Sequence, residues 1–95
     1  MPFTLLLPPP WSNQGWKAKI RDRERLEPPH VTIIQGVKSW RFCLRTEQFL
    51  DVQPDPKDVP AGLLSAIRGQ VVELRQQWDD MYPENPVRAE EQDDA

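Results

Sequence analysis

The alternation that decides the fold runs through residues 16–25, WKAKIRDRER. A cation stands at every second position of the later part of this stretch: Lys17, Lys19, Arg21, Arg23 and Arg25. Successive side chains of a β-strand point to opposite faces, so this spacing places all five charges on one face. The opposite face begins with the apolar residues Trp16, Ala18 and Ile20. We therefore predict a strand that rests on a core and carries a basic stripe on its outer side.

Two further strands are predicted after this one. Residues 31–35 are largely β-branched and apolar on both faces, which is typical of a central strand. Residues 38–45 alternate between a polar face and an apolar face, the latter formed by Trp40, Phe42 and Leu44. Gly36 and the short connection around it indicate an antiparallel hairpin. Residues 49–52 are predicted to add a short fourth strand.

A helix is predicted from about residue 60 to residue 81. Asp55, Pro56, Asp58 and Pro60 supply the acidic cap and early proline of a helix start. Apolar residues then recur at spacings of three and four: Leu63, Leu64, Ile67, Val71, Leu74, Trp78 and Met81. Gly69 costs up to about 1 kcal/mol relative to alanine, so we expect a close approach to the sheet there. The predicted fold class is α+β, an antiparallel meander of three to four strands packed by one long C-terminal helix.

The 95 residues form one small domain with a flanking segment on each side. Residues 1–15 are predicted to be a Pro-rich N-terminal arm, in which either Trp11 folds back over apolar surface or residues 5–11 bind a proline-recognising groove. Residues 16–83 form the α+β domain, and residues 84–95 are predicted to be an acidic disordered tail. The first ten residues lack the pattern of a signal peptide or a membrane span, so we expect a cytoplasmic protein with no membrane partner.

The charges divide along the chain. Residues 1–45 hold eight Lys or Arg and three Asp or Glu, a net +5, whereas residues 46–95 hold four and twelve, a net −8. The total is −3. This asymmetry predicts a basic surface together with an acidic segment that either compensates it within the chain or faces another protein.

The single cysteine and the single histidine limit which catalytic and metal-binding chemistry the chain can carry out. The single cysteine, Cys43, excludes an internal disulfide and a multi-thiolate zinc site, and no metal or cofactor motif is present. Cys43 shares a predicted strand face with Arg41 and Arg45, and cationic neighbours raise the reactivity of a thiol. No base or second thiol accompanies it, so we predict a small semi-buried side chain. His30 is the only histidine, and it is either a base near neutral pH or a turn residue bonded to a backbone carbonyl.

Four short motifs resemble a family of small prokaryotic proteins, the domain of unknown function 4160. They are Lys19-Ile20-Arg21, Pro28-Pro29-His30, Trp40-Arg41-Phe42 and Trp78, within roughly residues 17–85. The family often has a second histidine where this chain has Thr32, which argues against a His-x-His pair for metal binding or acid–base work. The resemblance implies pairing with another small protein, as in toxin–antitoxin-like gene pairs, or regulation linked to nucleic acids.

Three interpretations of the basic stripe remain open: binding of nucleic acid, docking of an acidic protein, and protection of an edge strand against aggregation. The leading hypothesis is a small non-enzymatic interaction protein that binds a protein partner through a basic sheet face. The predicted binding residues are Lys19, Arg21, Arg23, Arg25, His30, Arg41 and Arg45. The alternative is an RNA-binding protein or RNase-type toxin, in which His30 acts as the base and the arginines hold phosphate. A homodimer through a sheet edge is also compatible with the sequence.

Overall fold

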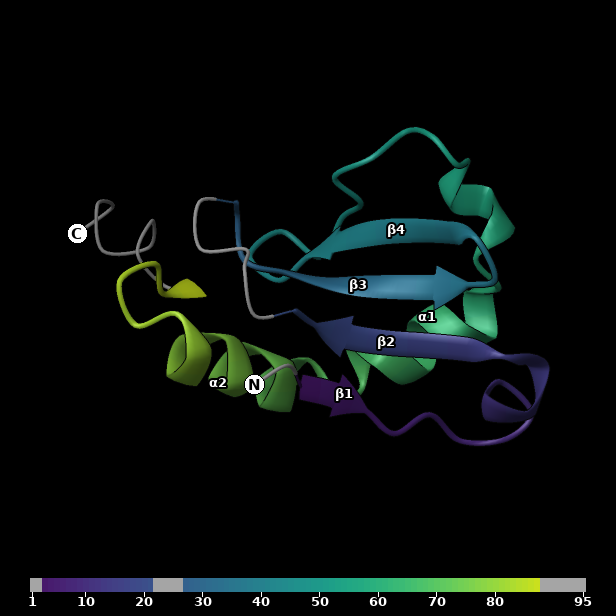
Figure 1. Ribbon diagram of the computed structural model, residues 1–95, viewed down its shortest axis with the longest axis horizontal. Helices are drawn as coiled ribbons and strands as arrows, with labels where there is room; N and C mark the ends of the chain where they lie inside the picture. Colours follow the sequence, from purple (N-terminus) through teal and green to yellow (C-terminus); the bar gives the residue numbers. More distant parts are fainter. Residues whose placement is uncertain (1–2, 22–26, 88–95) are drawn as a thin grey trace.

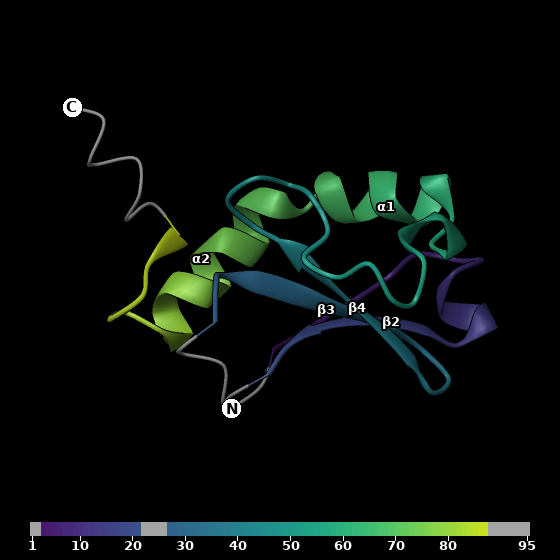
Figure 2. The same cartoon turned by 90° about the horizontal axis from the view of Figure 1, so that it is seen from above.

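The computed structural model describes residues 3–21 and 27–87. Four strands form one antiparallel sheet in the order of the chain: β1 (Phe3–Leu5), β2 (Trp16–Ile20), β3 (His30–Gln35) and β4 (Lys38–Cys43). Two helices, α1 (Ala61–Arg68) and α2 (Val71–Met81), pack on one face of the sheet (Figures 1 and 2). Short 3-10 turns span Ser12–Gln14 and Pro56–Asp58. The predicted α+β class and the antiparallel meander are confirmed.

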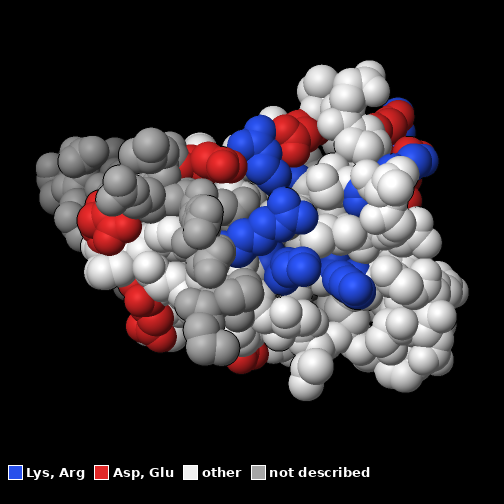
Figure 3. All heavy atoms as spheres, viewed as in Figure 1, with Lys and Arg blue, Asp and Glu red and all other residues white. Residues whose placement is uncertain are grey.

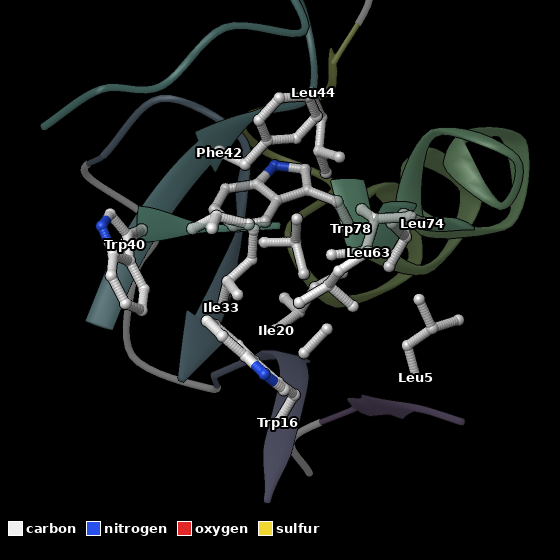
Figure 4. Close-up of a cluster of buried hydrophobic side chains, with 14 of the residues drawn as sticks. Leu5, Trp16, Ile20, Ile33, Trp40, Phe42, Leu44, Leu63, Leu74 and Trp78 are labelled. Atoms are coloured by element: carbon white, nitrogen blue, oxygen red, sulfur yellow. The ribbon is translucent and has the colours of Figure 1, made fainter. Parts of the chain in front are cut away.

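The core lies between the sheet and the two helices. Alternate residues of the strands face the helices, so that Ala18 and Ile20 of β2 are fully buried, whereas Lys17 on the opposite face is exposed. In Figure 4, Trp78 extends from α2 toward Phe42 and Leu44. The apolar face predicted for residues 38–45 and apolar residues of the predicted helix belong to one buried cluster, which includes Trp40, Phe42, Leu44, Ile67, Leu74 and Trp78.

The fourth strand comes from the N-terminal arm and not from residues 49–52. β1 pairs with β2 over Phe3↔Ile20, Thr4↔Lys19 and Leu5↔Ala18. Residues 49–52 contribute only an isolated bridge between Phe42 and Phe49. The chain turns sharply before this bridge, since Glu47 has a left-handed backbone with φ of 57°. The segment that follows therefore meets β4 at single positions and does not extend along it.

The predicted single helix is divided in two at Gly69 and Gln70. The backbone at Gln70, with φ of −110° and ψ of 16°, departs from helical values and redirects the chain. The close approach to the sheet expected at Gly69 is wrong, because a Cβ there would meet only the carbonyl oxygens of Ala66 and Ser65. The close approach occurs at Gly62, where a Cβ would lie 2.9 Å from the Trp11 ring. Trp11 thus folds back over α1, as one of the two interpretations predicted.

The ordered domain is larger than the predicted span of residues 16–83. At its start, β1 belongs to the sheet. At its end, Val87 is 3 % exposed and packs in the core. Its backbone N–H donates to Asp79 Oδ1 at 2.8 Å, and its carbonyl accepts from Arg45 Nε at 2.8 Å. The rest of the predicted acidic tail, residues 88–95, lies outside the described residues. Within the described part of the chain, neither helix has the length and apolar character needed to cross a membrane.

Candidate functional site: the outer face of the sheet

The outer face is the side of the sheet opposite α1 and α2. Strand register arranges its side chains in rows across the sheet. One row runs Thr4–Lys19–Thr32–Arg41, and the next runs Lys17–Ile34–Ser39. Figure 3 shows Lys and Arg side chains gathered on this side of the molecule, in front of the sheet drawn in the same view in Figure 1. The described part of this face therefore carries mainly polar and basic side chains.

The basic stripe is present on β2 for as far as the structure describes the strand. Lys17 is exposed, Lys19 is half-buried, and Arg21 is exposed immediately after the strand ends. Arg23 and Arg25 lie outside the described residues. β2 lies between β1 and β3, and β1 pairs with it at Ala18, Lys19 and Ile20. Lys19 is therefore not at a sheet edge, so protection of an edge strand does not account for this lysine.

Arg41 is held between two carboxylates. Its NH2 group lies 2.7 Å from Asp51 Oδ1, its Nε donates to both Asp51 oxygens, and its NH1 group lies 2.9 Å from Glu27 Oε1. The hydrogen bond from Arg41 lowers the pKa of Asp51, and the bonds to Asp51 and Glu27 raise the pKa of Arg41. This corner of the face thus brings the Arg41 guanidinium together with the carboxylates of Asp51 and Glu27. Arg41 holds Asp51 and Glu27 in place, and these two carboxylates offset its positive charge.

Asp51→Asn is expected to change how stability depends on pH. The pKa of Asp51 is lower in the folded protein than its ordinary value near 3.9, so its contribution to stability is present above about pH 4 and is lost as the pH falls through the folded-state pKa. At pH 7 the variant should lose about 1 kcal/mol of unfolding free energy, a modest loss because the Arg41 side chain is 38 % exposed.

Urea unfolding measured from pH 7 down to pH 2 checks this expectation. The wild type should lose stability more steeply than Asp51→Asn below pH 4, so that the two curves converge. Asp58→Asn is the control, since Asp58 meets Lys38 only at 3.9 Å and is half-exposed. A constant gap between wild type and Asp51→Asn at all pH values would contradict the assigned ion pair.

His30 lies in the interior and not on the basic surface. The residue is fully buried, and its ring centroid lies 5.5 Å from that of Trp78. Its Nδ1 is 2.8 Å from the carbonyl oxygen of Pro28; because a carbonyl only accepts, Nδ1 carries the proton. The predicted hydrogen bond from His30 to a backbone carbonyl is confirmed, although the residue is the first of β3 and not part of a turn. Its predicted place among the exposed binding residues does not agree with this position.

Arg45 and Cys43 also take structural positions. Arg45 donates to the carbonyls of Val87 and Pro86, each at 2.8 Å, and so fastens the end of the described chain. β4 ends at Cys43, so the predicted alternation does not continue to Arg45. Cys43 is 4 % exposed, in line with a small buried side chain.

Thr32 is a residue of this face that the sequence analysis did not include among the predicted binding residues. It lies between Lys19 and Arg41 in the cross-strand row and is 2 % exposed. Its Oγ1 has no hydrogen-bond partner in the part of the chain that the structure describes. The sequence could have indicated Thr32 because its hydroxyl lies among the apolar residues of a central strand. Burying a hydroxyl without a hydrogen-bond partner costs free energy.

Comparison with known proteins found no match for this chain. No family model matches the chain, no curated protein is significantly similar to it, and no solved structure matches its fold. Among the described residues, no group of three or more His, Cys, Asp or Glu is arranged to hold a metal ion. The resemblance to the domain of unknown function 4160 stays a prediction.

Proposed function

We propose that this protein is a non-enzymatic interaction module that binds an acidic segment of a protein partner on the outer face of its sheet. The observation that carries the proposal is the alignment of Lys17 and Lys19 along β2, on the face opposite the buried residues Ala18 and Ile20 that point toward the helices. Aligned like charges repel one another, and an acidic segment laid along the strand relieves that repulsion.

An acidic protein fits this surface better than a nucleic acid does. Single-stranded nucleic acids are usually held by aromatic side chains that stack on the bases. Trp16, Trp40 and Trp78 belong to the buried core, and the partly buried Trp11 packs against it. Two carboxylates, those of Glu27 and Asp51, also lie beside Arg41 and would repel a phosphate backbone.

The alternative of an RNase-type toxin depends on His30 as the base. A fully buried ring whose Nδ1 bonds a backbone carbonyl is poorly placed to take a proton from a ribose at the surface.

The proposal includes the setting in which the protein works: it is a cytoplasmic protein whose partner is the other member of a toxin–antitoxin-like pair. A homodimer through the free edge of β1 is the less favoured form, because that strand has three residues.

Fluorescence anisotropy with two labelled probes tests the proposal: a peptide of eight glutamates and an oligouridylate of similar charge. We expect the wild type to bind the peptide more tightly than the RNA. Lys17→Ser/Lys19→Ser should weaken peptide binding about tenfold, the sum of two charge contacts. The matched control is Lys38→Ser/Lys57→Ser, which removes the same charge from residues outside the basic stripe.

Each result has a defined meaning. Equal losses in the two double variants would show that only net charge matters and would overturn the proposed site. Absence of peptide binding at low salt would overturn the proposed function. Preference for the RNA probe, lost in the Lys17/Lys19 variant, would favour the nucleic-acid alternative.

A further inference from the structure

The hydroxyl of Thr32 is an unsatisfied polar group at the centre of the outer face. Thr32 is 2 % exposed, and its Oγ1 lacks a hydrogen-bond partner among the described residues. Most buried polar groups in proteins are hydrogen-bonded, so each exception calls for an explanation. Because the free energy cost of this hydroxyl falls on the unbound protein, a ligand that accepts its hydrogen bond recovers that cost on binding.

The surroundings of Thr32 define which ligand that is. In the register of the sheet, Lys19 lies directly opposite Thr32 on β2 and Arg41 lies directly opposite it on β4. Cβ atoms of such opposed residues are about 4.5–5.5 Å apart, so a Lys19 ammonium and the Thr32 hydroxyl can reach one small anion together. Lys19 is half-buried, and its long side chain can move aside to admit the ligand.

We propose that Thr32 and Lys19 form a subsite for one carboxylate of the bound acidic segment. One carboxylate oxygen accepts the Thr32 Oγ–H, and the other accepts from Lys19 Nζ. Arg41 stays with Asp51 and Glu27, at 2.7 Å and 2.9 Å, and these two carboxylates limit the site on its far side. A singly charged carboxylate meets less repulsion from them than a phosphate dianion does. This inference rests on the proposed function and specifies the chemistry of its contact.

Thr32→Val tests the subsite, because valine has nearly the shape of threonine and lacks the hydroxyl. We expect the Kd for the octaglutamate peptide to rise about fivefold to tenfold, as when one charge-assisted hydrogen bond is lost. The melting temperature should equal or exceed that of the wild type, since an unsatisfied buried hydroxyl has been removed. Thr32→Ser keeps the hydroxyl and should bind within about twofold of the wild type.

Thr4→Val is the matched control, since exposed Thr4 lies in the same cross-strand row on the other side of Lys19. It should leave the Kd unchanged. An unchanged Kd for Thr32→Val overturns the subsite, while a loss in Lys17→Ser/Lys19→Ser still upholds the proposed function. If Thr32→Val does not fold, amide chemical shifts of the wild type decide: octaglutamate must move the Thr32 signal more than the Thr4 signal, and the reverse order overturns the subsite.

Discussion

Replacing Trp78 by alanine is expected to lower the free energy of unfolding by about 3 to 5 kcal/mol. Trp78 is fully buried, and its ring centroid lies 4.3 Å from that of Tyr82 and 5.5 Å from that of His30. Its Nε1–H donates to the carbonyl of Asn85 at 2.8 Å. The substitution therefore leaves a large cavity and also frees the segment after α2. A loss of this size approaches the whole stability of many small domains.

Urea unfolding followed by circular dichroism measures this loss. Trp78→Phe is the first control; it keeps an aromatic ring but removes the N–H, so we expect an intermediate loss of about 1 to 2 kcal/mol. Val72→Ala is the second, because Val72 lies on the same helix and is 77 % exposed, and it should change stability by less than about 0.5 kcal/mol. A Trp78→Ala loss as small as that of Val72→Ala would mean that α2 does not pack on the sheet through this residue.

Ending the chain at residue 83 is expected to cost about 3 kcal/mol or more relative to a chain that ends at residue 87. The four residues removed include Val87, whose buried side chain contributes about 1.5 to 3 kcal/mol. They also include the Asn85 carbonyl, and without it the Nε1–H of Trp78 loses the acceptor that the structure gives it. Asn85 Nδ2 further donates to the carbonyl of Glu27 at 2.8 Å, which fixes the chain just before β3.

Thermal and urea unfolding of the two truncated chains, compared side by side, test this expectation. Arg45→Ala in the chain that ends at residue 87 is the accompanying variant; it removes the donors to Val87 and Pro86 and should give part of the same loss. Equal stability of the two truncated chains would show that residues 84–87 are not part of the cooperative fold.

Most of the architecture is encoded in local periodicity. The alternation in residues 16–25 and 38–45 predicts which face of each strand is buried, and the three-and-four spacing from Leu63 to Met81 predicts the apolar side of the helices. Local periodicity could not predict that the helix divides at Gly69 and Gln70. One glycine costs a helix only about 1 kcal/mol, so packing decides whether the helix continues.

Contacts between residues distant in sequence account for what local patterns missed. β1 could not be recognised from three residues, since a strand this short is defined by its partner β2. The same holds for the candidate site: Arg41 meets carboxylates 14 and 10 residues away, at Glu27 and Asp51.

The sequence by itself determined the fold class, the buried faces and the cationic side of β2, because side-chain direction in a strand or helix follows from spacing alone. Only the tertiary structure decided that His30 is buried, that Arg41 is neutralised, and that the Thr32 hydroxyl lies without a partner between two cations. Burial and hydrogen bonding depend on which segments pack together, and spacing along the chain does not specify them.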